Sequence, residues 1–166
     1  MNRLKNLIIS ISVCIFFTGM ATGQSFSDQY HVAVGLRAGE SAGLSLKVNN
    51  QNSSGCEFLL GLWSNWISFT GLYEKNVQAF NINGMRWYYG AGGHIALETN
   101  TYYEQGRSYD RGSDFALGID GIVGLEYKIP QIPFAVSLDL KPFLEMYRNG
   151  NLYFSADPGI GVKFTF

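Results

Sequence analysis

The last fifteen residues of the chain, Leu152 to Phe166, alternate between two kinds of side chain. Counting back from Phe166, every second residue is apolar: Phe164, Val162, Ile160, Pro158, Ala156, Phe154 and Leu152. The residues between them are small or polar. A period of two predicts a β-strand. Fifteen residues exceed the usual length of a soluble strand and suit a tilted strand that crosses a bilayer and projects beyond it.

A strand in lipid must have all of its backbone N–H and C=O groups paired, so the chain has to supply enough strands to close a barrel. The same alternation predicts seven more strands, at about Tyr30–Ala38, Gly43–Asn49, Cys56–Trp63, Trp66–Lys75, Met85–Glu98, Phe115–Ile129 and Phe134–Tyr147. We therefore expect an all-β fold, an eight-stranded antiparallel up-and-down transmembrane β-barrel. Bacterial outer-membrane barrels have an even number of strands.

The predicted connections differ in length in a regular way. The sixteen residues Thr99 to Asp114 form the longest connection, whereas Pro130 to Pro133 form a short, stiff turn. If both termini are periplasmic, the long connection faces the outside of the cell and the short turn faces the periplasm. Known outer-membrane barrels also have long outer loops and short periplasmic turns. Long outer loops often carry function, so five side chains of this loop are candidate contacts for a ligand or partner, with simple solvation as the alternative. They are Tyr102, Tyr103, Arg107, Tyr109 and Arg111.

Two features depart from regular alternation. Pro142 and Pro158 each lack a backbone donor within a predicted strand, so we expect a bulge or an end of pairing at each. Leu59 and Leu72 fall on the polar face of their strands, which makes the alternation weaker there.

The composition of the polar face favours a membrane barrel over a soluble lipocalin-like barrel. A soluble barrel needs solvated side chains over its whole exterior, but here the polar face is mostly Gly, Ala and Ser with isolated charges. Small residues suit the crowded interior of a narrow barrel. Aromatic residues near strand ends suit girdles at the two membrane interfaces. They are Tyr30, Trp66, Tyr73, Trp87, Tyr89, Tyr127, Phe134, Phe164 and Phe166.

This choice of faces turns the charged residues of the strands toward the lumen. Seven are acidic, six are basic and one is histidine: Arg37, Lys47, Glu57, Glu74, Arg86, His94, Glu98, Asp120, Glu126, Lys128, Asp139, Lys141, Asp157 and Lys163. Buried charges are tolerable when they are paired and hydrogen-bonded. We therefore predict a network of salt bridges that fills the lumen and leaves no wide pore.

The N-terminus reads as a targeting segment. Arg3 and Lys5 precede an apolar run from Leu7 to Phe17, and small residues precede Gln24, so we expect a cleaved signal peptide at residues 1–23 and a barrel domain at 24–166. The mature part has 10 basic and 13 acidic residues, a formal charge of 10 − 13 = −3, which does not suggest a nucleic-acid partner. Cys14 leaves with the signal peptide, so Cys56 has no intrachain disulfide partner.

The sequence contains no pattern that demands catalysis, a metal or another cofactor. His94 and Glu98 lie about 13 Å apart on one strand face, too far to share a metal without help from neighbouring strands. A lipid-modifying hydrolase needs its nucleophile beside lipid, whereas His94 is predicted to point inward. The glycine-rich stretch Gly90–Gly93 lacks the strand–loop–helix context of a phosphate-binding loop.

Several stretches together resemble a family of small outer-membrane β-barrel proteins of Bacteroidetes-type bacteria. They are Gly35–Gly39, Gly43–Lys47, Thr70–Glu74, Trp87–Gly92, Gly118–Lys128 and Ser137–Pro142. The resemblance implies a barrel similar to OmpA or OmpX, with no catalytic motif to transfer. Gly161, Phe164 and Phe166 resemble the C-terminal signal that such proteins present to the barrel assembly machinery, which implies location in the cell outer membrane.

The expected function is that of a non-enzymatic, structural or accessory outer-membrane protein, in contact with outer-membrane lipid and part of a larger membrane assembly. The alternatives are a lipid-modifying outer-membrane enzyme or narrow, porin-like channel, and a soluble lipocalin-like barrel that binds a small apolar ligand.

Overall fold

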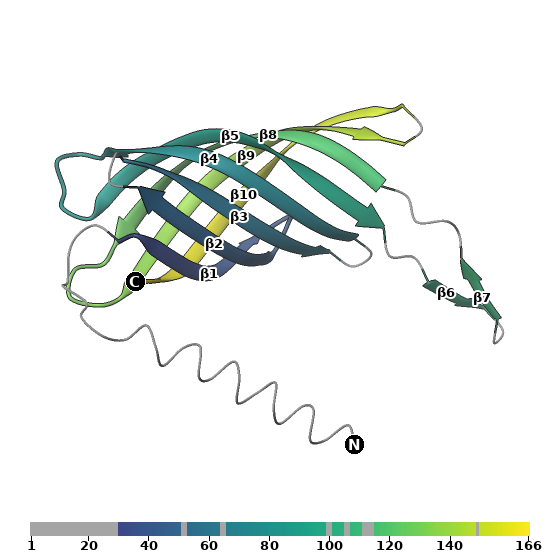
Figure 1. The fold of residues 1–166 in the computed structure, drawn as a ribbon, viewed down its shortest axis with the longest axis horizontal. Coiled ribbons are helices and arrows are strands. Elements are labelled where there is room, and N and C mark those ends of the chain that lie inside the picture. Colours follow the sequence, from purple (N-terminus) through teal and green to yellow (C-terminus); the bar gives the residue numbers. More distant parts are fainter. Residues whose placement is uncertain are drawn as a thin grey trace, which may run out of the picture.

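The computed structural model describes residues 30–50, 53–63, 66–98, 101–104, 107–110, 115–148 and 150–166, with positions 63, 98, 101–104 and 107–110 described by their backbone alone. Eight strands close an antiparallel barrel in the order β1-β10-β9-β8-β5-β4-β3-β2 (Figure 1). Their bounds are β1 Val32–Gly39, β2 Gly43–Asn50, β3 Ser54–Trp63, β4 Trp66–Gln78, β5 Met85–Glu98, β8 Phe115–Lys128, β9 Phe134–Tyr147 and β10 Leu152–Thr165. The predicted fold class is confirmed, with strand ends shifted by up to three residues.

The two ends of the chain close the barrel against each other. Strand β10 pairs with β1 from Ala33 opposite Thr165 to Gly39 opposite Gly159. Beyond the ladder, the Phe166 N–H donates to the Val32 carbonyl at 2.8 Å, and the His31 N–H donates to the Phe166 carbonyl at 3.1 Å. The C-terminal strand is therefore fixed on both sides, by β9 and by β1.

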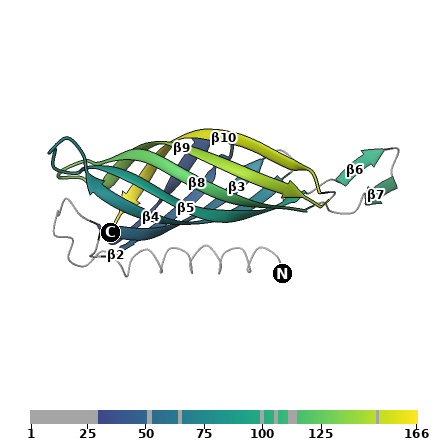
Figure 2. The ribbon, with the colours of Figure 1, turned by 90° about the horizontal axis from the view of Figure 1, so that it is seen from above.

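The long connection between β5 and β8 contains a hairpin that the sequence prediction treated as loop. Strands β6, Thr101–Glu104, and β7, Arg107–Asp110, pair with Tyr102 opposite Tyr109. They form a separate two-stranded sheet beyond the end of the barrel that lies opposite the C-terminus (Figure 2). Four of the candidate contact residues, Tyr102, Tyr103, Arg107 and Tyr109, have their backbone in this hairpin, and Arg111 lies outside the described residues.

Both prolines interrupt pairing, as predicted. Pairing of β8 with β9 runs to Asp120 opposite Phe143 and resumes at Val123 opposite Leu140, which leaves Pro142 without a partner on β8. The register is the same on both sides of this gap, so no bulge forms. Pro158 lies one residue beyond Gly159, where the ladder with β1 ends. A residue without an N–H is tolerated at each place because no ladder hydrogen bond is required there.

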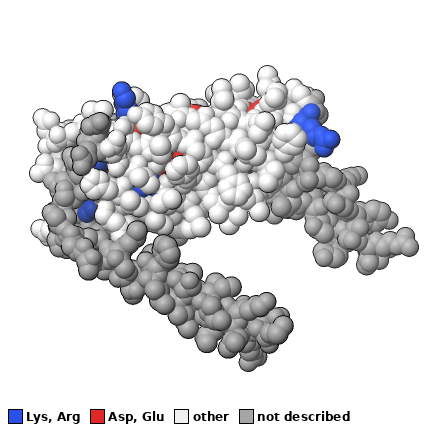
Figure 3. All heavy atoms as spheres, in the orientation of Figure 1, with Lys and Arg blue, Asp and Glu red and all other residues white. Residues whose placement is uncertain are grey.

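The outward face of the barrel is apolar. Exposed Leu36, Leu138 and Phe154 show 64%, 65% and 71% of their surface, and the other outward positions are mostly Leu, Ile, Val and aromatic residues. On the face seen in Figure 3, white atoms cover most of the barrel and few charged atoms appear. In the described part of the chain, no helix has the length and apolar character needed to cross a membrane.

Small residues on the inward face make room for larger neighbours. A Cβ atom on Gly124 would lie 2.4 Å from Cζ of Tyr88, and one on Gly159 would lie 2.4 Å from Cζ of Arg37. On Gly118, it would lie 2.2 Å from Cε1 of His94. The rings of Tyr88 and His94 and the guanidinium of Arg37 therefore lie against strand positions that only glycine can occupy without a shift.

We expect Gly124→Ala to destabilise the barrel by about 1–3 kcal/mol, because the Tyr88 ring is fully buried and has to move. The measurement is equilibrium urea unfolding of the refolded protein. The control is Gly121→Ala on the same strand, where the new Cβ would lie 3.4 Å from Cγ of Pro142, an ordinary contact. Equal unfolding free energies for the two variants would contradict the packing argument.

Candidate functional site

The predicted lumen charges are mostly where the alternation placed them. Twelve of the fourteen are buried: Arg37, Lys47, Glu57, Glu74, His94, Asp120, Glu126, Lys128, Asp139, Lys141, Asp157 and Lys163. Arg86 is half-buried at the barrel end where Tyr30 lies, and the side chain of Glu98 lies outside the described residues. We group the interacting residues into three clusters, each named after one of its members.

The Arg37 cluster joins three strands. The guanidinium of Arg37 reaches Oδ1 of Asp139 through Nη2 at 2.6 Å and Oδ2 of Asp157 through Nη1 at 2.8 Å. Asp157 also accepts hydrogen bonds from the Glu40 N–H at 2.7 Å and from the Ser41 hydroxyl. One buried arginine therefore forms ion pairs with two acids and ties β1 to β9 and to β10.

The Lys47 cluster lies at the level of the Tyr88 ring. Lys47 Nζ is 2.8 Å from Glu74 and 3.7 Å from Glu126. Lys163 Nζ is 2.8 Å from Glu57 and 3.4 Å from the same Glu126. Two lysines and three glutamates therefore share one buried region, in which Glu126 bridges the two cations.

Tyrosine hydroxyls complete this polar interior. Tyr88 donates to Oδ2 of Asp139 at 2.9 Å, while Lys47 Nζ lies 4.2 Å from the centre of its ring, so this residue links the Arg37 and Lys47 clusters. Tyr30 donates to Oε1 of Glu126 at 2.5 Å. Burial, followed by the nearby Glu126 carboxylate, raises the pKa of Tyr30 well above its usual range, so the phenol remains a donor.

Tyr30 therefore corrects one sequence prediction. Trp66 and Tyr30 are both predicted to belong to an interfacial aromatic girdle, but Trp66 lines a cavity inside the barrel and Tyr30 is buried and turned into the lumen. Tyr30 precedes β1, and the alternation of that strand does not extend back to it.

The His94 cluster lies nearer the outer end, by which we mean the end of the barrel opposite Tyr30 and Phe166. His94 Nδ1 is 2.8 Å from Oδ2 of Asp120, and the second Asp120 oxygen is 3.0 Å from Lys141 Nζ. The other ring nitrogen, Nε2, is 3.6 Å from Oε1 of Glu145. Glu145 is buried, yet the sequence analysis missed it because the alternation of β9 was followed only as far as Pro142.

An apolar layer crosses the middle of the lumen. Leu59, Leu72, Tyr88 and Ile122 pack together as one buried cluster. The weak alternation at Leu59 and Leu72 thus has a physical cause: both side chains point inward and fill the lumen. Lys47, Glu74, Glu126 and Asp157 are at most 1% exposed, as expected for a lumen filled by side chains.

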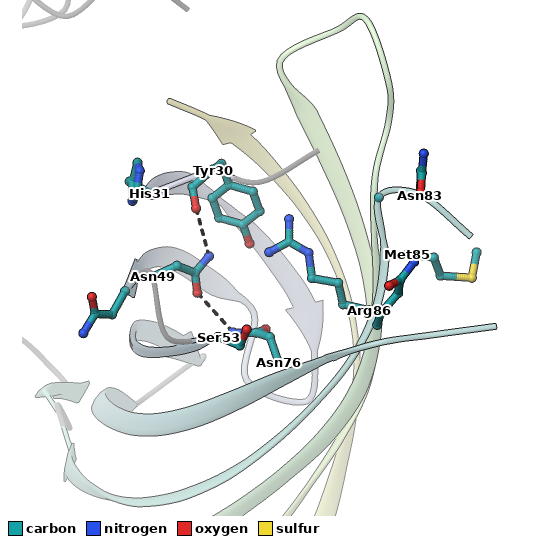
Figure 4. A pocket seen from close by; sticks show the side chains of 11 residues that line it. Tyr30, His31, Asn49, Ser53, Asn76, Asn83, Met85 and Arg86 are labelled. Atoms are coloured by element: carbon teal, nitrogen blue, oxygen red, sulfur yellow. Dashed lines mark hydrogen bonds between the residues drawn. The ribbon is translucent and has the colours of Figure 1, made fainter. Parts of the chain in front are cut away.

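A polar cavity of about 320 Å³ opens at the barrel end where Tyr30 and Arg86 lie (Figure 4). Asn76 Nδ2 donates to Oδ1 of Asn49 at 3.3 Å, and Asn49 Nδ2 donates to the Tyr30 carbonyl at 3.5 Å. The guanidinium of Arg86 lies 5.2 Å from the centre of the Tyr30 ring. The wall of this cavity is therefore rich in amides, with one cation.

A second cavity, of about 350 Å³, lies at the outer end. Four aromatic residues contribute to its wall: Trp66, Phe143, Tyr147 and Tyr153. The polar part of the wall includes His94, Lys141 and Glu145 from the His94 cluster. Among the described residues, no group of three or more His, Cys, Asp or Glu side chains has the arrangement of a metal site.

Three other residues singled out from the sequence, Lys128, Gly161 and Phe164, make their contacts with other parts of the barrel. Lys128 donates to the carbonyls of Ile129 at 3.1 Å and Ile132 at 2.8 Å, in the β8–β9 turn. Gly161 is buried opposite Ser137. The Phe164 ring packs against Phe134 and Phe166 with ring centres 5.3 Å and 4.9 Å apart, an aromatic group at the end of β10.

Comparison with known proteins adds one likeness. No protein-family model matches the chain. No curated protein matches it. Among solved structures, the chain is similar to the crystal structure of Neisserial surface protein A, with a TM-score of 0.56 and 11% sequence identity over 81% of this chain and 93% of that one. At this identity the likeness shows a shared barrel fold and nothing about activity.

We expect Arg37→Met to destabilise the barrel by about 3–5 kcal/mol, because Asp139 and Asp157 would each lose their buried cation. The free energy of unfolding in urea measures this cost. Arg148→Met is the control, since Arg148 is exposed in the β9–β10 turn. Losses of similar size in the two variants would show that the Arg37 cluster does not stabilise the lumen.

Proposed function

We propose that this chain is a closed, non-enzymatic β-barrel of the cell outer membrane that serves as a structural or accessory component. The observation that carries the proposal is the distribution of polarity. Apolar side chains cover the outside of the barrel, and balanced ion pairs fill the inside. Lipid rather than water is the solvent that suits such an exterior.

The soluble lipocalin-like alternative is disfavoured by the same distribution. A soluble barrel of this size would expose Leu36, Leu138 and Phe154 to water together with the rest of the apolar band. Surfaces of soluble monomers rarely carry apolar patches of this extent. The likeness to Neisserial surface protein A supports the same choice, because that surface protein shares the fold.

The filled lumen supports a structural role over a conducting one. The Lys47 cluster and the layer around Tyr88 occupy the space through which ions would have to pass. The ion pairs in this proposal neutralise one another and hold the strands together, and they take no part in catalysis.

Targeting and assembly complete the proposal. Residues 1–23 act as a cleaved signal peptide, and the mature barrel begins at Gln24. The barrel assembly machinery recognises the C-terminal strand through Gly161, Phe164 and Phe166, and the protein takes its place in a larger membrane assembly. The resemblance of the quoted sequence stretches supports, within this proposal, a relationship to small barrels of Bacteroidetes-type bacteria.

Electrophoretic mobility of the detergent-refolded mature chain, with and without boiling, tests the membrane barrel. A folded barrel that resists detergent should migrate differently before and after heating. Planar-bilayer recording of the same preparation should give no steady conductance. A mature chain that stays soluble without detergent and shows no mobility shift would overturn the membrane assignment, and a steady conductance would overturn the closed lumen.

A charge introduced in the middle of the apolar band should be costly. Leu140 is exposed near the centre of β9, so we expect Leu140→Arg to cost about 2–4 kcal/mol in lipid vesicles. Leu152→Arg is the matched control, because Leu152 begins β10 at the outer end and should cost about 0–1 kcal/mol. Urea unfolding from vesicles measures both. Equal losses of unfolding free energy in the two variants would show that the outer face of the barrel does not lie across a bilayer.

A further inference from the structure

The cavity at the outer end is lined by aromatic residues and by polar residues of the His94 cluster. Trp66 and Tyr147 meet edge to face with ring centres 6.2 Å apart, and Phe143 and Tyr153 lie 6.2 Å apart. All four residues line the cavity, whose volume of about 350 Å³ suits a small organic molecule. Aromatic faces attract cations through their quadrupoles.

The hydrogen bonding of His94 leaves an acceptor facing this cavity. Asp120 is paired with Lys141 and accepts only, so His94 must donate to it through Nδ1–H. In the neutral imidazole the remaining nitrogen, Nε2, is then an acceptor. It lies 3.6 Å from Oε1 of Glu145, which is also an acceptor. Two acceptors that face each other are relieved by a donor between or beside them, which can be water or a group of a ligand.

The charges around the cavity favour a donor that carries a positive charge. Lys141 is paired with Asp120, and Asp157 is paired with Arg37. The two other carboxylates of the lining are Glu145, which is buried, and Glu40, which is exposed at the rim. The Tyr147 hydroxyl hydrogen-bonds Glu145, but as a neutral group it brings no positive charge.

We propose that the outer cavity binds an organic cation, a protonated primary amine carried on an aromatic or aliphatic body. The ammonium group donates to Nε2 of His94 and to the Glu145 carboxylate, while its body packs against Trp66, Phe143 and Tyr153. This role lies beyond the structural function proposed above and does not depend on whether the barrel lies in a membrane.

The probe is phenethylammonium, compared with its neutral counterpart 2-phenylethanol, added to the full barrel refolded in detergent. Binding is followed by backbone amide shifts in nuclear magnetic resonance spectra. We expect saturable shifts at residues lining the cavity, and about tenfold weaker binding of the alcohol, because hydrogen bonds to charged groups are the stronger ones. Shifts elsewhere on the barrel, or equal binding of the two probes, would overturn the proposal.

Two pairs of variants test the residues. Glu145→Gln should weaken phenethylammonium binding by about tenfold, whereas Glu40→Gln makes the same chemical change at the exposed rim and should change it by less than about threefold. Trp66→Leu should weaken the binding of both probes. Trp87 lies on the outside near the other end of the barrel, so Trp87→Leu should leave the binding of both probes unchanged. The boiled and unboiled mobilities confirm that each variant is folded.

If the His94 imidazole is instead protonated, it donates directly to Glu145 and the cavity needs no cation. Phenethylammonium would then bind no better than the alcohol, and Glu145→Gln would leave its affinity unchanged. Either result would refute the proposed cation site.

Discussion

Pairing of the backbone is the constraint on which the rest of this structure depends. A sheet exposed to lipid cannot leave an open edge along its length, so the first and last strands have to meet. Here β1 and β10 do so, and Phe166 extends the connection with three backbone hydrogen bonds to His31 and Val32. Once the sheet closes with eight strands, its diameter leaves room for little more than its own side chains. The inward composition follows from that narrow space.

The interior shows how a narrow lumen can hold many charges. Arg37, Lys47, Lys141 and Lys163 each lie near at least one acid, and several acids serve two partners, as Asp139 does with Arg37 and Tyr88. Isolated charges would be expensive in this environment, whereas a network with satisfied hydrogen bonds is tolerated. Glycine has an equal part, because Gly118, Gly124 and Gly159 create the space in which His94, Tyr88 and Arg37 lie. On neighbouring strands, acids therefore lie beside cations, and glycines lie beside large side chains.

The period of two made most of the fold and the inward charges predictable from sequence, because a strand fixes the face of each residue without tertiary information. The prediction failed at residues whose orientation could not be read from this period alone. Tyr30 lies before β1 and turns inward against the phase of the strand, and Glu145 follows a proline across which the phase in fact persists. The choice of partners, such as Arg37 with Asp139, also escaped prediction, since it depends on register and side-chain reach across strands 102 residues apart in sequence. The outer cavity combines residues from several strands and has no sequence motif.

The seam between β1 and β10 has a consequence for the folding of the chain. Its ladder joins residues such as Val34 and Phe164, which lie at opposite ends of the barrel sequence, so the seam cannot form until the last strand has been synthesised. Contacts of such high sequence separation make folding slow, and until closure the apolar faces and free edges remain open to aggregation. The strand that arrives last therefore decides when the barrel can close.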